Sequence, residues 1–261
     1  RPADPDSAAR ITASANRSVA ALVAVTPAGD LPGSGICVRD GQILTTTTAL
    51  AGATTVWVVS ADGDQHAATI LGRDDATGLV LLRADETGLE PASLAEDGSV
   101  RVGAWVLALG SSDSSGPWVT TGVIASMGGW ADDGTGVAKA GLINTSASMP
   151  NGARGGALVD RDGRVVGILA GSAGGTNGGL ATPVSVLRSV ATQLADAGHA
   201  THGALGVRAA ETTSPRGARV TEVFLGSGAA AAGIETGDVI TNLDGTPIRD
   251  TAGLVATVRD R

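Results

Sequence analysis

Short runs of β-branched and aliphatic residues, separated by glycine, aspartate and asparagine turns, fill the chain from about residue 17 to residue 187. Hardly any helical periodicity lies between these runs. Representative runs are SVAALVAV (18–25), QILTT (42–46), LVLLRAD (79–85) and RVVGILAG (164–171). Many short strands at this spacing predict an antiparallel β-sandwich or a pair of β-barrels.

The two ends of the chain differ from this middle part. Residues 1–16 are mostly Pro, Asp, Ala and Ser with little apolar periodicity, which predicts a linker or tail. A helical pattern, PVSVLRSVATQLADAG, begins at Pro183 and ends at Gly198, and we expect it to close the first domain. Residues 199–261 alternate short strand-like and helix-like pieces and predict a small second αβ module.

Composition narrows the function classes. Of the 261 residues 43% are apolar, which is enough for a sizeable core. The net charge is −8 and the sequence has no basic block, so neither nucleic acid nor an anionic lipid surface is expected as a partner. The single cysteine, Cys37, excludes an internal disulfide, and we expect it to be a small buried hydrophobe. His66, His199 and His202 have no metal-ligand spacing, so no metal or cofactor is expected. The longest purely apolar run, 19–25, is far below the ~20 residues that cross a bilayer.

Several segments have the residues and the order of motifs of a known family. They are GSG (33–35), DGQILT (40–45), RDDATGLVLLRAD (73–85), VRVGAWVLALG (100–110), GARGGALVDRDGRVVGI (152–168) and GGLATPVSVL (178–187). Together these segments resemble the HtrA (DegP-like) family of trypsin-fold serine proteases. The tail is similar to a bacterial PDZ domain through GALGV (203–207) and GSGAAAAGIETGDVITNLDGTPI (226–248).

The resemblance implies a mainly β protein with two antiparallel β-barrels of trypsin-like type, followed by a small α+β PDZ-like domain. The double-barrel domain is expected over 17–198, with the barrels meeting near 95–105. The PDZ-like domain is expected over 199–261 and to be incomplete at its C-terminal end, where the family would add closing strands.

The residues at the family's three catalytic positions cannot do its chemistry. Serine proteolysis needs a hydroxyl nucleophile, an imidazole base and a carboxylate that holds the imidazole. By resemblance, the histidine position is Thr48, the aspartate position is Gly78 and the serine position is Arg154. A threonine hydroxyl is no base near neutral pH, glycine has no side chain, and a guanidinium is no nucleophile. We therefore expect a natural pseudoprotease rather than an enzyme.

An alternative is an active site built from displaced residues. Ser146 and Ser148 precede the lost nucleophile, Asp74 and Asp75 lie beside the lost aspartate, and Lys139 is the only lysine available for a serine–lysine dyad. The competing interpretation is that all five are ordinary solvated turn residues, as Ser and Asp usually are.

The loop around the family's serine position is expected to keep the backbone shape of a catalytic site. Gly152 and Gly155 keep the glycines of the oxyanion loop, so an anion-binding nest is one expectation. For Arg154 three arrangements remain open: pairing with a carboxylate so that it plugs the cleft, offering a cation to an acidic ligand, or pointing into solvent.

The PDZ-like module is the stronger candidate for a surviving function. Such domains bind an extended C-terminus by β-augmentation, with the carboxylate on loop amides and the last side chain in an apolar pocket. The residues expected to form this groove are Ala204, Leu205, Gly206 and Val207 from the loop and strand, and Leu254 and Val258 from one face of a helix. The alternative is that these residues are plain core and that the chain itself closes the groove.

Two function hypotheses follow. The first is an inactive, extracytoplasmic scaffold or regulator of the cell envelope, which binds peptide C-termini, a partner protein or active protease paralogues. Its membrane contact is expected only through an anchor upstream of residue 1. The second is an active serine endopeptidase of envelope protein quality control that uses displaced catalytic residues.

Overall fold

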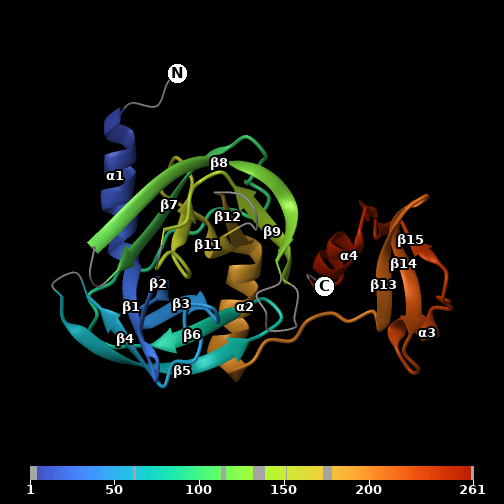
Figure 1. Ribbon diagram of the computed structural model, residues 1–261, viewed down its shortest axis with the longest axis horizontal. Helices are drawn as coiled ribbons and strands as arrows, with labels where there is room; N and C mark the ends of the chain where they lie inside the picture. The colour runs from blue at the N-terminus through green and yellow to red at the C-terminus, as the bar shows by residue number, and fades with distance from the viewer. Residues whose placement is uncertain are drawn as a thin grey trace.

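Two closed six-stranded barrels and a small αβ domain make up the computed structural model (Figure 1). The structure describes residues 5–60, 63–112, 116–131, 139–150, 152–172 and 178–259. This architecture confirms the predicted fold class, two antiparallel trypsin-like barrels followed by an α+β domain.

The first barrel closes in the strand order β1-β2-β3-β6-β5-β4, with every pairing antiparallel. Its strands are β1 (Val19–Thr26), β2 (Gly29–Arg39), β3 (Gln42–Thr46), β4 (Thr55–Val59), β5 (Gln65–Asp74) and β6 (Leu79–Arg83). Strand β1 is apolar from Val19 to Val25 because both of its faces are buried over most of this length: Ala20 and Leu22 fill the barrel, whereas Val19 belongs to a core outside it.

The second barrel repeats the arrangement in the order β10-β11-β12-β9-β8-β7. Its strands are β7 (Trp105–Ser112), β8 (Gly116–Ala131), β9 (Lys139–Thr145), β10 (Ala157–Val159), β11 (Val165–Ser172) and β12 (Gly179–Pro183). The first barrel thus ends at Arg83 and the second begins at Trp105. Ile124, Ile143 and Leu158 fill its interior.

A shared apolar core joins the two barrels. It contains Leu44 and Leu81 from the first barrel and Leu107 and Ile168 from the second. Helix α2 (Val184–Ala197) completes it and ends at Gly198 in the left-handed region, as the sequence predicted. In the described part of the chain, no helix combines the length and the apolar character that spanning a membrane requires.

The N-terminal segment differs from the expected linker or tail. Pro5–Ala15 form helix α1, which a short 3-10 turn, η1 (Asn16–Ser18), connects to β1. Ala8 and Ile11 pack, together with the buried Ala15, against the core shared by the two barrels. This contact stabilises a helix for which the sequence offers only a weak pattern, because short helices depend on packing rather than on propensity.

The PDZ module is a sheet with helices against it. Its elements are β13 (Val207–Thr213), β14 (Arg216–Val223), α3 (Gly228–Ala231), β15 (Val239–Ile240), β16 (Asn242–Leu243), β17 (Thr246–Pro247) and α4 (Thr251–Arg259). Ala218, Ile248 and Leu254 form its small core. Helix α4 lies between this sheet and the second barrel, where it packs on β8 and β9 (Figure 1). There the Arg259 guanidinium donates to the Ala140 carbonyl oxygen at 2.9 Å.

Candidate functional site

The family's histidine position lies just after β3, as the resemblance implies. Thr48 is half-buried there, and its hydroxyl donates to the Ala170 carbonyl oxygen of the second barrel at 3.3 Å. The same Oγ1 lies 3.2 Å from Oγ1 of Thr46. Thr48 therefore ties the two barrels together, and a hydroxyl in this place has no capacity to take a proton at neutral pH.

At the family's aspartate position, a neighbouring side chain occupies the space next to Gly78. Gly78 is buried immediately before β6 with a φ of +73°, and its carbonyl oxygen accepts from the Thr47 N–H at 2.8 Å. A Cβ added to Gly78 would lie 2.9 Å from Cε of Lys139 and 3.4 Å from Oγ1 of Thr47. The lysine stem thus occupies the space that a side chain at position 78 would need.

The serine position carries an exposed cation. Arg154 follows Ala153 in the loop before β10, and its carbonyl oxygen accepts from the Ser34 N–H of the first barrel at 2.9 Å. Its guanidinium makes no hydrogen bond or ion pair with the residues that the structure describes. Arg154 therefore does not plug the cleft through a carboxylate, and its exposed guanidinium is compatible with both of the other arrangements, the solvent-facing one and a cation offered to an acidic ligand.

The loop at the family's oxyanion position forms hydrogen bonds within the protein. The Ser34 hydroxyl donates to the Gly152 carbonyl oxygen at 2.9 Å, and the Gly155 N–H donates to Leu169 O at 2.8 Å. Gly155 has a φ of +85°, and an added Cβ would lie only 2.0 Å from Ser34 O. Glycine is therefore required at position 155 for backbone packing, and its amide is already paired.

The displaced serine–lysine dyad does not assemble. Lys139 begins β9, whereas Ser146 follows the end of that strand, so a rise of about 3.3 Å per residue separates them by roughly 20 Å. Ser146 and Ser148 are exposed, and Oγ of Ser146 accepts from the Val123 N–H at 3.0 Å. The serines are thus solvated as the alternative interpretation held, but Lys139 is buried.

In the described part of the chain, one histidine–serine pair lies within hydrogen-bond distance, and neither of its residues stands at a family catalytic position. Nε2 of His66 lies 3.2 Å from Oγ of Ser60, and that hydroxyl also bonds to Asp64 O at 3.0 Å. Within the described residues no carboxylate bonds to the His66 ring, and none of their His, Cys, Asp and Glu side chains gather into a group that could hold a metal ion. The pair lacks the third group that would orient an imidazole base.

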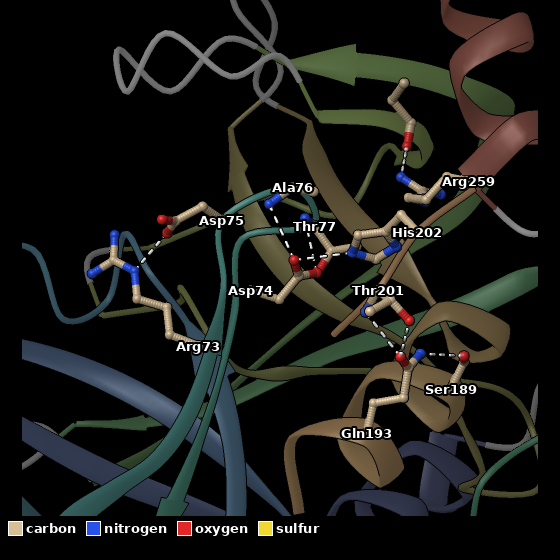
Figure 2. Close-up of polar contacts among 11 residues, drawn as sticks. Arg73, Asp74, Asp75, Ala76, Thr77, Ser189, Gln193, Thr201, His202 and Arg259 are labelled. Carbon is tan, nitrogen blue, oxygen red and sulfur yellow. Dashed lines mark hydrogen bonds and ion pairs between the residues drawn. The ribbon is translucent and has the colours of Figure 1, made fainter. Parts of the chain in front are cut away.

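A histidine–aspartate pair was missed by the sequence analysis. Nε2 of His202 lies 3.0 Å from Oδ1 of Asp74, and both side chains are largely buried (Figure 2). Asp74 also accepts from the N–H of Ala76 and from the N–H and hydroxyl of Thr77. Asp74 is therefore not the solvated turn residue that was expected, whereas Asp75 is exposed and pairs with Arg73.

The segment after α2 is held at two points. His202 contacts the turn before β6, and Oε1 of Gln193 on α2 accepts from the N–H and the hydroxyl of Thr201 at 2.9 and 3.1 Å (Figure 2). No serine hydroxyl bonds to His202 among the described residues, so this pair belongs to the connection between the domains rather than to a triad.

An apolar groove of about 420 Å³ runs along the PDZ module. All six residues that the sequence analysis placed in it lie along its walls: Ala204, Leu205, Gly206, Val207, Leu254 and Val258. Residues that were not anticipated complete the lining: Ala76, His202, Gly203, Phe224, Val255 and Arg259. Phe224 is the only phenylalanine of the chain, but no sequence pattern linked it to the groove.

The groove has the edge and the loop that strand addition requires. Among the described strands β13 pairs only with β14, so its other edge faces the groove. At the loop, Gly206 has a φ of +79° and packs where an added Cβ would lie 2.2 Å from Cβ of Ser227. Its carbonyl oxygen accepts from the Phe224 N–H at 2.9 Å, which fixes the loop against the end of β14.

The single cysteine is buried and its thiol has a raised pKa. Cys37 is buried in β2, and its Sγ bonds to Arg39 O at 3.2 Å. Burial, with a smaller contribution from the charge of Asp40, raises the pKa of the Cys37 thiol from 9.0 to about 11. The thiol is protonated at neutral pH, as expected for a small buried hydrophobe.

Two family models match the chain. Residues 33–168 match the trypsin-like peptidase domain, and residues 203–260 match the PDZ domain.

Curated relatives share about a third of the residues. The periplasmic pH-dependent serine endoprotease DegQ of Escherichia coli is 32% identical over 242 residues, which is 85% of this chain and 52% of DegQ. The serine protease PepD of Mycobacterium tuberculosis is 34% identical over 222 residues, 78% of this chain and 47% of PepD. The chain spans about half the length of the curated relatives it matches.

Solved structures agree over almost the whole chain. The HtrA-type protease AlgW with a tripeptide superposes with a TM-score of 0.79 at 27% identity, covering 96% of this chain and 87% of AlgW. A serine endoprotease from Yersinia pestis gives 0.72 at 27% identity, covering 100% and 90%. With both domain types present in this order, the chain belongs to the HtrA (DegP-like) family of trypsin-like peptidases with a C-terminal PDZ domain.

Proposed function

We propose that this chain is a catalytically inactive HtrA-like protein that acts as an extracytoplasmic scaffold or regulator and binds peptide or protein C-termini in its PDZ groove. The relative DegQ is a periplasmic protease by name, and the location is inferred from it. A membrane anchor outside the present sequence is part of the same proposal.

The observation that carries the proposal is the chemistry at the three family positions. The Thr48 hydroxyl donates a hydrogen bond to the Ala170 carbonyl oxygen, Gly78 has no side chain, and Arg154 presents a guanidinium to solvent. Acyl transfer on this fold requires a base that removes the proton of the nucleophile in the transition state. None of these three side chains supplies a base or a nucleophile.

The PDZ groove supports the binding half of the proposal. The unpaired edge of β13 offers backbone groups to an extended segment, and Leu205, Val207, Leu254 and Val258 form the apolar walls around it. Strand addition uses main-chain bonds for affinity and such a pocket for the last side chain. A ligand with a free C-terminal carboxylate and an apolar last residue is the occupant that this groove favours.

Catalysis is tested by incubating the purified chain with unfolded casein and with a fluorophosphonate serine probe. We expect no cleavage and no labelling, and we expect the single revertant Arg154→Ser to stay inactive because base and orienting carboxylate are still missing. Cleavage by the native chain that Ser146→Ala or Ser148→Ala abolishes would establish the alternative, an endopeptidase with displaced residues.

Binding is tested by selecting C-terminal peptides from a random display library and measuring the selected sequences by fluorescence polarisation. We expect apolar last residues and loss of binding when the carboxylate is amidated. Val258→Glu should abolish binding, whereas Leu225→Glu, a fully exposed position outside the groove lining, should not. Equal binding of the amidated peptides would contradict the proposed mode.

A further inference from the structure

We propose that Lys139 is a fourth residue that keeps this site inert: its side chain fills the place of the catalytic aspartate, so the triad cannot be rebuilt at the three family positions alone. This inference rests on the proposed function. It concerns how the inactive state is built, and it identifies a residue that lies outside every catalytic motif of the sequence.

The lysine side chain reaches from one barrel into the other. Lys139 begins β9 of the second barrel, and Gly78 ends the turn before β6 of the first. A Cβ at position 78 would lie 2.9 Å from Cε and 3.9 Å from Cδ of Lys139. Lys139 is only 6% exposed, so protein atoms surround its stem and restrict its escape to solvent.

The positive charge of Lys139 hinders a catalytic aspartate at position 78 in addition to the steric contact. The ammonium lies one bond beyond Cε, and the carboxylate carbon of an aspartate at position 78 would lie one bond beyond Cβ, so a rotation of either side chain can bring the two charged groups within reach of an ion pair. A charge-assisted bond to the ammonium would then compete with the bond to the imidazole N–H that a triad aspartate must accept. The φ of +73° at Gly78 adds a backbone cost for any side chain.

The two positions are complementary. Lys139 is the only lysine in a chain with seventeen arginines, and its unbranched stem fits beside a residue that has no side chain. An arginine would bring a wider, planar guanidinium into the same buried space. Glycine at position 78 and lysine at position 139 therefore form one arrangement, in which the first makes room for the second.

A stability cycle tests the contact without reference to catalysis. Gly78→Ala is introduced into the native chain and into the Lys139→Ala chain, and the melting temperatures of all four proteins are measured. The backbone cost at position 78 is common to both backgrounds and cancels in the cycle. We expect Gly78→Ala to lower the melting temperature by at least twice as much in the native background. Equal shifts would overturn the proposal, and Lys139→Val, which also has no atoms beyond Cγ, serves as the background if Lys139→Ala does not fold.

A second experiment tests the consequence for chemistry. The triple variant Thr48→His, Gly78→Asp, Arg154→Ser is compared with the same variant carrying Lys139→Ala, and with a control carrying Lys139→Arg. We expect the fluorophosphonate probe to label the Lys139→Ala quadruple variant at least ten times faster than the triple variant or the Lys139→Arg control. Equal labelling of the triple and Lys139→Ala variants, whether rapid or absent, would overturn the role of Lys139. Labelling of the unmodified chain would instead refute the proposed inactivity, so the two failures are distinguishable.

Discussion

Removal of the Asp74 carboxylate is expected to destabilise the protein far more than removal of its neighbour. The Asp74 side chain is 6% exposed and accepts from Nε2 of His202 at 3.0 Å, from two backbone N–H groups and from the Thr77 hydroxyl. In Asp74→Ala, the buried donors lose this acceptor. Asp75→Ala is a matched control, because Asp75 is exposed and, among the residues that the structure describes, its side chain bonds only to Arg73.

The magnitude follows from these contacts. Leaving a buried donor unpaired costs about 1–3 kcal/mol, and a hydrogen bond to a charged group contributes about 1.5–3 kcal/mol. The cost of burying the carboxylate offsets part of this, so a net loss of about 3 kcal/mol is expected for Asp74→Ala. An exposed ion pair such as Arg73–Asp75 contributes about 0–1 kcal/mol.

The assay is thermal and urea unfolding of the native chain and the two variants, followed by circular dichroism. At about 2–4 °C per kcal/mol for a domain of this size, Asp74→Ala should lower the melting temperature by about 6–12 °C. His202→Ala should give a smaller shift, since Asp74 then keeps its bonds to the turn. Similar shifts for Asp74→Ala and Asp75→Ala would refute the argument that burial and bond number decide the cost.

Four further outcomes are expected. The raised pKa of Cys37, about 11, leaves roughly a thousandth of the thiol ionised at pH 8, so a disulfide reagent should modify this cysteine only when the protein unfolds. Rapid modification of the folded chain would contradict this expectation. The folded thiol keeps its proton to a higher pH than the unfolded thiol, so its contribution to the free energy of unfolding should be intact below about pH 9 and lost as the pH rises through about 11. In a pH series of urea midpoints, Cys37→Ala should remove this pH-dependent loss of stability. Gly155→Ala should prevent normal folding or lower the melting temperature by more than 10 °C, because the new Cβ would lie 2.0 Å from Ser34 O. Leu254→Ala should cost about 2–5 kcal/mol in urea unfolding because this side chain is 4% exposed, whereas Val255→Ala, at a 50% exposed position of the same helix, should cost less than about 1 kcal/mol.

The strands, the closing helix and the groove could be predicted because their signals are local. Alternating or continuous apolar runs between turn residues identify strands whatever their partners are, and the helix before Gly198 carries both its start and its stop. The groove residues, such as Leu205 and Val258, follow from a short loop motif and from helical spacing.

Helix α1 could not be predicted because its support is distant. Ala8, Ile11 and Ala15 recur at helical spacing, but two of the three are alanines, which give a weak apolar signal. Their burial depends on the core shared by the two barrels, and that surface exists only when both barrels have folded.

The sequence by itself determined which side chains stand at the family's catalytic positions, because Thr48, Gly78 and Arg154 lie within recognisable motifs. Only the tertiary structure decided what surrounds them. The burial of Asp74 depends on a chain segment far along the sequence that brings His202 onto its turn, and the place of Lys139 depends on how two separate barrels meet. Spacing along the chain carries no information about such contacts, since they form between side chains that only the packing of the barrels and the connecting segment brings together.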